Sequence, residues 1–221
     1  MSLSLKEKVS SIFYFLSHPS SLKMILSFRE SGYLNDEGWF KSFELQRPVD
    51  KNGNPIPWFT YPAIDFLKER LNKNLSAFEY GCGNSTLFFA ERIKEIISVE
   101  TNISWFNKIK SELKSNSDVI FYDNNLVEFQ YHETIKQLDK KFDLIIIDAI
   151  NRNEAMKISP DYLNPAGVII LDNSDVEDYS TGTSYLISQG FNRLDFWGIQ
   201  AGYFNKTCTT IFYKSNNCLG I

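Results

Sequence analysis

The alternation of short apolar runs with helical patterns constrains the fold most strongly. Runs that read as strands fall near residues 75–80, 95–99, 118–122, 142–148 and 167–172, with helical patterns between them. This rhythm predicts a parallel sheet with helices on both faces, because parallel strands need crossover connections. Two further runs, near residues 191–197 and 207–213, have no helix between them. We expect them to form an antiparallel hairpin.

The sequence therefore predicts an α/β fold with a doubly wound, seven-stranded and mostly parallel sheet. Residues 61–221 are expected to form the main domain, and residues 1–60 an N-terminal helical and irregular extension. Within the extension, residues 4–29 show amphipathic helical patterns that break near His18 and Pro19. Residues 32–62 are rich in turn formers, and we expect them to be irregular.

Length, charge and cysteine content narrow the class of protein. The 221 residues suffice for one α/β domain plus an extension. The net charge is −4, and no cluster of lysine and arginine is dense enough to bind a phosphate backbone, so we expect no nucleic-acid partner. Cys82, Cys208 and Cys218 lack the spacing of a metal site or a disulfide framework, and their odd number favours a reducing compartment.

The first residues carry one short apolar run, from Ile12 to Leu16, which His18 and Pro19 interrupt. It is too short to span a membrane. The segment also lacks the layout of a signal peptide, because a glutamate and serines interrupt the part that should be apolar. We expect a soluble, cytoplasmic protein with no membrane partner; the sequence leaves its oligomeric state open.

The stretch FEYGCGNSTLFFA, residues 78–90, carries the strongest functional signal. A strand runs into Glu79, Gly81 and Gly83, and a helical pattern follows. Glycines at such a turn let the backbone approach a ligand closely, although an ordinary strand-to-helix turn also favours glycine. The dinucleotide fingerprint G-x-G-x-x-G/A is incomplete, because Thr86 stands at its third position. An acidic residue before the glycines would repel phosphate, and it suits a ligand with hydroxyls or positive charge.

Glu100 ends the second strand, about 20 residues beyond the glycines. An α/β nucleoside site places its ribose-binding acid at this distance. A carboxylate can accept hydrogen bonds from both vicinal ribose hydroxyls. A solvated acid at the start of the next helix would also fit this position, but the pairing with the glycine loop favours a nucleoside site.

These features resemble the class I S-adenosylmethionine (SAM)-dependent methyltransferases, which have a Rossmann-like fold. The resemblance covers residues 71–214 and includes FDLIIIDA, residues 142–149, and LNPAGVIILDNSD, residues 163–175. It implies that SAM is the cofactor and that the chain is an enzyme of class EC 2.1.1. The residues expected to bind SAM are Glu79, Gly81, Gly83, Asn84, Ser85, Glu100, Asp123 and Asp148. For Asp123 and its neighbour Asn124, a turn at the end of the strand explains the residue types equally well.

Polar residues also follow two fully apolar runs. Asp148 ends the strand that contains Ile145–Ile147, and Asp172 with Asn173 ends the next strand. Adjacent parallel strands would bring these three residues to one edge of the sheet, where ligands of such folds bind. Their oxygens suit Mg²⁺, Ca²⁺ or Mn²⁺, although helix capping or a turn would also use these residue types.

This arrangement resembles the metal-dependent O-methyltransferases of the catechol and caffeoyl-CoA type. The resemblance implies that Asp148, Asp172 and Asn173 are catalytic and hold a divalent ion, Mg²⁺ for example, which lowers the pKa of the acceptor hydroxyl. Those enzymes have a lysine three residues after the first aspartate, where this chain has Asn151 followed by Arg152. Arg152 could clamp an anionic acceptor or be an exposed arginine at the start of a helix.

We therefore expect a SAM-dependent methyltransferase that acts on a hydroxyl oxygen of a small molecule. The alternatives are a metal-free N-methyltransferase, another transferase of this fold, an inactive SAM-binding module, or an NAD-dependent oxidoreductase. The resemblance implies that the N-terminal segment, with Trp39 and Trp58, covers the SAM site and shapes the acceptor pocket. A hydrophobic cluster that pins this segment to the main domain would also explain these aromatic residues. The loop from Gly198 to Lys206 is a further candidate for acceptor binding.

Overall fold

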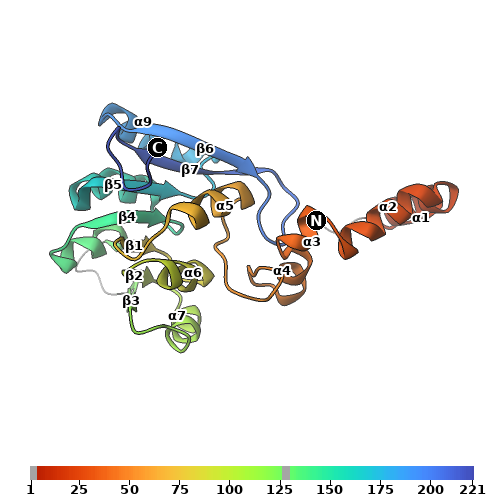
Figure 1. Ribbon diagram of the computed structural model, residues 1–221, viewed down its shortest axis with the longest axis horizontal. Coiled ribbons are helices and arrows are strands. Elements are labelled where there is room, and N and C mark those ends of the chain that lie inside the picture. Colours follow the sequence, from red (N-terminus) through yellow and green to blue (C-terminus); the bar gives the residue numbers. More distant parts are fainter. Residues whose placement is uncertain (1–3, 126–129) are drawn as a thin grey trace.

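The computed structural model describes residues 4–125 and 130–221. It contains a seven-stranded sheet of order β3-β2-β1-β4-β5-β7-β6 (Figure 1). The strands are β1 (Ser76–Tyr80), β2 (Glu95–Glu100), β3 (Ser117–Phe121), β4 (Phe142–Ile147), β5 (Leu163–Leu171), β6 (Asn192–Gly198) and β7 (Thr207–Tyr213). Strand β7 runs antiparallel to both of its neighbours, β5 and β6, and the pairs among β1 to β5 are parallel. The predicted fold class is confirmed, including the C-terminal hairpin.

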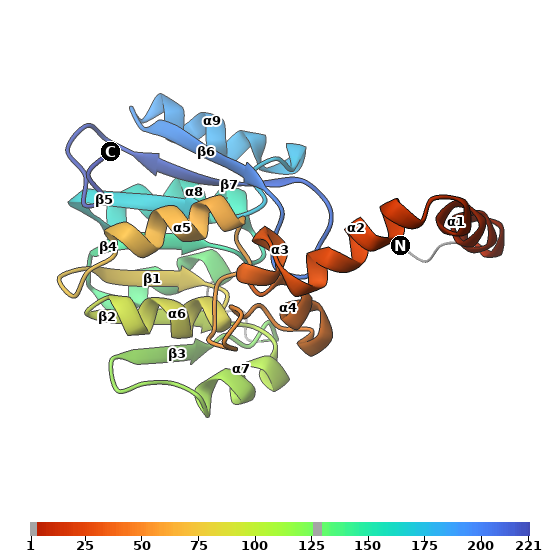
Figure 2. The ribbon, with the colours of Figure 1, turned by 45° about the vertical axis from the view of Figure 1, so that its right-hand side comes forward.

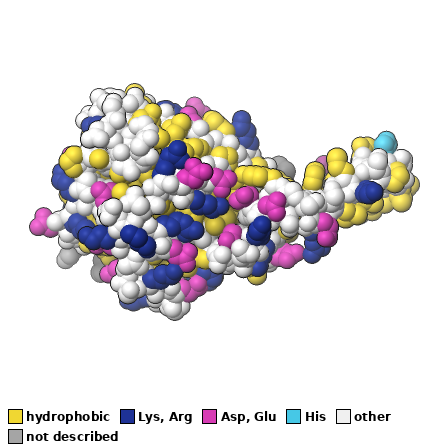
Figure 3. All heavy atoms as spheres, viewed as in Figure 1, with side chains coloured by type: hydrophobic (Ala, Val, Ile, Leu, Met, Phe, Trp, Pro, Cys, Tyr) yellow, Lys and Arg dark blue, Asp and Glu magenta, His cyan; other side chains and the backbone are white. Residues whose placement is uncertain are grey.

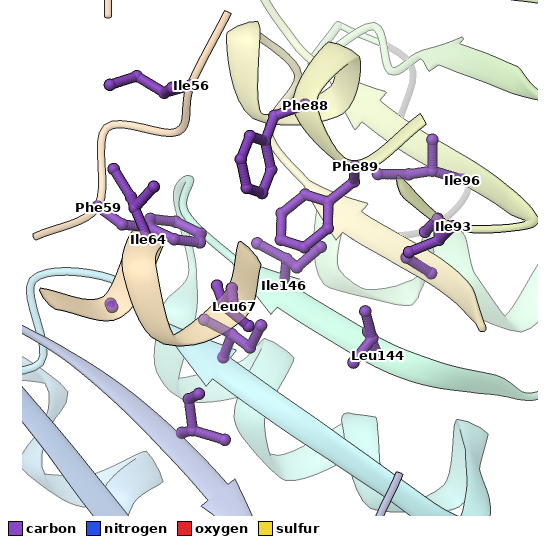
Figure 4. Packing of buried hydrophobic residues seen from close by; sticks show 14 of the residues in the cluster. Ile56, Phe59, Ile64, Leu67, Phe88, Phe89, Ile93, Ile96, Leu144 and Ile146 are labelled. Atoms are coloured by element: carbon purple, nitrogen blue, oxygen red, sulfur yellow. The ribbon is translucent and has the colours of Figure 1, made fainter. Parts of the chain in front are cut away.

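One face of the sheet is covered by α5 (Tyr61–Arg70) and α6 (Asn84–Arg92) (Figure 2). Phe88 and Phe89 of α6 meet Ile146 of β4 in a core without solvent access (Figure 4). The neighbouring α7 (Ile103–Lys110) packs beside β3 through Phe106 and Ile109. Helix α5 begins with proline in its first turn, where the missing N–H costs nothing.

The opposite face is covered by the 3₁₀ helix η1 (Tyr131–Leu138), α8 (Arg152–Ile158) and α9 (Ser180–Ser188). Two short 3₁₀ helices, η2 (Ser159–Tyr162) and η3 (Glu177–Tyr179), precede β5 and α9. Ile145 and Ile147 point to this face, whereas Leu144 and Ile146 point to the other. A central parallel strand is therefore buried on both sides, which explains its continuous apolar sequence.

The chain begins with α1 (Leu5–Ser17) and α2 (Pro19–Glu30), which project away from the sheet as an arm. Ser4 caps α1 in a reciprocal pair of hydrogen bonds with Glu7, and Pro19 begins α2, so the predicted break lies where the sequence placed it. Neither helix contains a buried residue. Leu5 and Leu16 are among the exposed apolar residues of these helices. Hydrophobic side chains, in yellow, are visible at the surface of the arm in Figure 3.

Two short helices, α3 (Tyr33–Asp36) and α4 (Trp39–Leu45), lie in the region that we expected to be irregular. The turn-forming residues in this region do not predict helices, because the helical segment around Trp39 is stabilised by contacts with residues far away in the sequence. Trp39 is buried, and its indole N–H donates to the backbone oxygen of Tyr203 over 2.9 Å. Farther along, the indole N–H of Trp58 donates to the oxygen of Ala201 over 3.0 Å. The segment before the main domain is thus fixed to the loop between β6 and β7.

Within residues 4–125 and 130–221, every helix is too short or too polar to cross a membrane.

The packing of β4 predicts a large effect of truncation at its centre. Ile146 has no exposed surface and contacts core residues from α5 and α6, so Ile146→Ala should lower the free energy of unfolding by about 2–5 kcal/mol. Ile103 on α7 is 51% exposed, and Ile103→Ala should change it by less than about 1 kcal/mol. Urea unfolding compares the two variants. Equal losses would contradict this placement of the core.

Candidate functional site

The glycine loop joins β1 to α6, and its two glycines have different roles. Gly81 has a φ of +94°, and a Cβ there would lie 2.7 Å from the backbone oxygen of Asp148. Only glycine fits this conformation and this approach. Gly83 has an extended φ of 175°, and a Cβ there would meet no atom closer than 3.8 Å. The structure therefore requires Gly81 for folding, whereas Gly83 leaves space beside the loop.

Glu79 lies beneath this loop without any solvent access. Its Oε2 accepts hydrogen bonds from the hydroxyls of Thr86, at 2.5 Å, and Ser98, at 2.6 Å. The Thr86 hydroxyl in turn accepts the backbone N–H of Gly83 over 3.0 Å. The other carboxyl oxygen, Oε1, is buried and has no hydrogen-bond partner among residues 4–125 and 130–221. Glu79 thus supports the loop from inside through Oε2.

A cavity of about 340 Å³ opens above the glycine loop. Its lining residues come from the glycine loop, the first turn of α6, the ends of β2 and β4, helices α7 and η1, and the N-terminal segment. They are Pro48, Trp58, Gly81, Cys82, Gly83, Asn84, Ser85, Glu100, Thr101, Trp105, Tyr131, Asp148, Ala149 and Ile150. This is the edge where the carboxyl ends of the parallel strands meet and where α/β folds bind ligands. Its size is in the range of small-molecule sites.

Glu100 enters this cavity from the end of β2 in a fixed orientation. Its Oε1 accepts the backbone N–H groups of Thr101 and Asn102, both over 2.8 Å. Its Oε2 accepts the N–H of Cys82 over 3.3 Å. A carboxylate offers about four acceptor positions, so at least one remains available to a ligand.

The N-terminal segment closes one side of the cavity through Asn84, the first residue of α6. The Asn84 amide donates to the oxygen of Pro48 over 2.5 Å and accepts from Arg47 Nε over 2.6 Å. Arg47 also forms a salt bridge of 2.5 Å with Glu112. The indole N–H of Trp105, another lining residue, donates to the oxygen of Cys82 over 2.5 Å, so this wall is also fixed. Polar contacts therefore hold both walls in place.

Arg152 lies between the ends of β4 and β5. Its Nη2 contacts Asp148 Oδ1 at 3.0 Å, and its Nε donates to the oxygen of Ala149 over 2.8 Å. Its Nη1 donates to the backbone oxygen of Asp172 and, over 3.3 Å, to Asn173 Oδ1. Arg152 is therefore neither an exposed arginine nor a free clamp for an anion, which were the two possibilities that the sequence left open.

The structure brings Asp148, Asp172 and Asn173 together, but the arrangement does not fit the predicted divalent ion. Both carboxyl oxygens of Asp172 are already engaged, Oδ1 by the Thr209 hydroxyl at 2.7 Å and Oδ2 by the Gln200 amide at 2.8 Å. The Arg152 guanidinium contacts all three residues and supplies the positive charge that an ion would bring. Across residues 4–125 and 130–221, no group of three or more histidine, cysteine or acidic side chains is arranged to hold a metal.

Three carboxyl groups at this edge have raised pKa values. Burial raises the pKa of Glu79 to about 7, against the opposing effect of its hydroxyl partners. Burial raises the pKa of Asp148 to about 6, and the charge of Arg152 opposes this shift. Burial also holds the pKa of Asp172 well above its usual value, and the charge of Asp148 reinforces this. Clusters of perturbed carboxyl groups beside a cavity are typical of functional sites.

Most residues predicted to bind the cofactor line the cavity: Gly81, Gly83, Asn84, Ser85, Glu100 and Asp148. Glu79 lies behind the loop and supports it. Asp123 accepts hydrogen bonds from the backbone and side chain of Asn125 and is not among the lining residues that the structure describes. Asp172 and Asn173 also lie outside the lining, so Asp148 alone of the three proposed catalytic residues reaches the cavity.

Several lining residues carry no signal in the sequence. Pro48, Trp105 and Tyr131 belong to three separate segments, and only folding brings them together. Tyr131 is placed by its hydroxyl, which donates to the oxygen of Val99 over 3.1 Å. Trp105 follows the helix cap Asn102, which marks the start of α7 but not the direction of the indole.

Comparison with solved structures identifies the fold. No family model matches the chain, and no curated protein matches its sequence. A methyltransferase from Pyrococcus furiosus is 16% identical, with a TM-score of 0.52 over 80% of this chain and 94% of that one. A protein from Streptococcus mutans in complex with S-adenosylhomocysteine (SAH) is 16% identical, with a TM-score of 0.51 over 68% of this chain and 94% of that one. A spermidine synthase from Thermotoga maritima is 16% identical, with a TM-score of 0.51 over 70% of this chain and 56% of that one. The chain has the Rossmann-like fold that these proteins share.

The different roles of the two glycines predict different effects on stability. Gly81→Ala places a Cβ against the Asp148 backbone at positive φ and should lower the free energy of unfolding by about 1–3 kcal/mol or more. Gly83→Ala is sterically free and should stay within about 0.5 kcal/mol of the native chain. Thermal and urea unfolding measure both. A larger loss for Gly83→Ala would show that the loop has a different conformation.

The raised pKa of Glu79 predicts that the free energy of unfolding decreases as the pH rises. The carboxyl ionises near its ordinary value of 4.5 in the unfolded chain and near 7 in the folded one. Its stabilising contribution is therefore complete below pH 4.5 and is lost as pH rises toward 7, by about 1.4 kcal/mol per pKa unit. Urea unfolding across this window should show a shallower slope in Glu79→Gln. The Glu79→Gln variant should still lose some stability as the pH rises, because the pKa values of Asp148 and Asp172 are raised as well.

The exposed Glu69, whose side chain is 78% exposed, supplies the control for this titration. Glu69→Gln should retain the full slope. An unchanged slope in Glu79→Gln would contradict a titration of the buried carboxyl.

Proposed function

We propose that this protein transfers a methyl group from SAM to a hydroxyl oxygen of a small-molecule acceptor. The observation that carries the proposal is the position of Glu100. Its carboxylate is oriented by three backbone N–H groups and faces a cavity whose floor is the glycine loop. This combination suits a nucleoside whose ribose hydroxyls donate to the carboxylate.

Charge favours SAM over a dinucleotide as the ligand. The Glu100 carboxylate lines the cavity beside the glycine loop. A pyrophosphate would be repelled there, whereas the sulfonium and amino groups of SAM are positive. The Streptococcus mutans protein of the same fold was solved with SAH, the product that remains when SAM has lost its methyl group. We carry this ligand over to the present chain as part of the proposal.

Asp148 is the group best placed to handle the proton of the acceptor. It lines the cavity, and its pKa of about 6 leaves it mostly ionised at neutral pH while still able to take up a proton. Bound SAM would supply an electrophilic methyl group on its sulfur. The acceptor oxygen would take this methyl group from the sulfur, and Asp148 would accept the proton that the oxygen gives up. Positioning of the two reactants supplies much of the acceleration in such a transfer.

Arg152 holds Asp148 in place and offsets its charge. The proposed methyl transfer therefore needs no divalent ion. The guanidinium links Asp148 to the backbone of Asp172. Asp172 and Asn173 therefore act as positioning residues for Arg152, and through it for the base.

Binding of SAH tests the nucleoside site directly. In calorimetric titrations we expect the native chain to bind SAH and Glu100→Ala to bind at least about tenfold more weakly, because hydrogen bonds to a charged group contribute about 1.5–3 kcal/mol. Glu95 begins the same strand at its opposite end and pairs with Lys140. Glu95→Ala is the matched control and should bind SAH like the native chain.

The outcomes separate the alternatives. Equal weakening in both variants, or binding of NADH in place of SAH, would overturn the nucleoside assignment. SAH binding without methyl transfer to hydroxylated or amino acceptors would indicate an inactive SAM-binding module. If transfer occurs, we expect EDTA to leave its rate unchanged, and a requirement for added Mg²⁺ would contradict the role given to Arg152.

A further inference from the structure

A second cavity, of about 530 Å³, lies beside the first, between α4 and the loop that joins β6 to β7. Four aromatic side chains surround it: Phe43, Trp58, Tyr203 and Phe204. The remaining lining residues are Ser42, Gln46, Ala201, Gly202 and Asn205. None of these side chains carries a charge, although the chain as a whole has 23% charged residues. The cavity is therefore an aromatic, uncharged site at the surface of a charged protein.

Trp58 lines both cavities. Its indole N–H already donates to the oxygen of Ala201, so the ring has a fixed position and offers the cavities its apolar surface. The next residue before Ala201 is Gln200, whose amide donates to Asp172 at the edge of the sheet. Ala201 in the wall of the second cavity is therefore one residue away from Gln200, which contacts Asp172 of the proposed reaction centre.

The walls are held by contacts that do not depend on a ligand. The buried Trp39 stacks on Phe43 with ring centroids 5.7 Å apart and contacts Phe204 at 4.5 Å. Gly202, at a φ of +76°, lets the loop approach α4 so closely that a Cβ would lie 3.3 Å from the backbone of Phe43. The site is therefore largely formed before any ligand arrives, as small-molecule sites usually are.

Three of the four aromatic side chains around this cavity are exposed to solvent. Phe43 is 51% exposed, Tyr203 52% and Phe204 75%. Burial of apolar surface away from water is favourable, and aromatic rings also gain from offset or edge contacts with other rings. A flat ring inserted between these side chains would gain both contributions.

We propose that this second cavity binds an uncharged aromatic ring of the acceptor and sets the substrate class of the enzyme. This inference rests on the proposed function, since it takes the first cavity as the SAM site. An anionic acceptor would find no lysine or arginine among the lining residues, and a cationic amine no carboxylate. Desolvation of either charge would therefore be uncompensated. A hydroxyl on the bound ring would lie toward Trp58 and the first cavity.

Three probes with one ring system test the charge preference. We would titrate 2-naphthol, 2-naphthoate and 2-naphthylmethylammonium at pH 7 into the full chain, with and without saturating SAH. We expect 2-naphthol to bind at least about tenfold more tightly than either charged analogue. Phe204→Ala should weaken it about fivefold and leave SAH binding unchanged, because Phe204 lines only the second cavity.

Phe13→Ala is the control, because Phe13 is a comparably exposed phenylalanine on the N-terminal arm, 67% exposed, and lines neither cavity. It should bind 2-naphthol like the native chain. Equal weakening by Phe13→Ala and Phe204→Ala, or tighter binding of a charged probe, would overturn the proposal. So would SAH binding without any binding of 2-naphthol. Binding of 2-naphthol that depends on Phe204 in a protein unable to bind SAH would support the aromatic site and count against the proposed methyl transfer.

Discussion

The contacts of the Arg152 guanidinium hold together the acidic residues at the ends of β4 and β5. Two aspartates end adjacent parallel strands, and burial there disfavours their charged forms. Arg152 offsets this by contacting the Asp148 carboxylate, the backbone of Asp172 and the amide of Asn173. The ends of β4 and β5 are thereby held together, and Asp148 is the one member of the group turned to the cavity. The largely buried guanidinium of Arg152 lies where the residue types alone had predicted a metal ion.

The glycine loop shows how one motif can combine folding and binding requirements. Gly81 is required by the close approach of the Asp148 backbone, whereas Gly83 has free space on its cavity side. Glu79 is buried behind the loop and is not among the residues that line the cavity. It holds Thr86 and Ser98, and Thr86 accepts the Gly83 N–H. An acidic residue before the glycines thus orders the loop from the inside.

The elements that depend on local pattern were predictable from the sequence, and those that depend on distant contacts were not. Continuous apolar runs such as Ile145–Ile147 identified the central strands, and Pro19 marked the break in the arm. Helix α4 was missed because Trp39 gains its stability from the loop after β6, more than 160 residues away. The strand-end acids were found from their positions, but the partners that decide their chemistry, Thr209 and Gln200 for Asp172, lie on a later strand and loop. The aromatic cavity draws on three separated segments, and the sequence indicated only that Trp58 and the loop after β6 could take part.

A crystal structure of the chain with SAH would test the nucleoside site most directly. We expect the ribose hydroxyls within hydrogen-bonding distance of the Glu100 carboxylate, and the sulfur near Asp148 and Trp58. SAH bound away from the glycine loop, or in a pose that leaves Glu100 without contact to the ribose, would contradict the assignment of the cavity and with it the proposed methyl transfer.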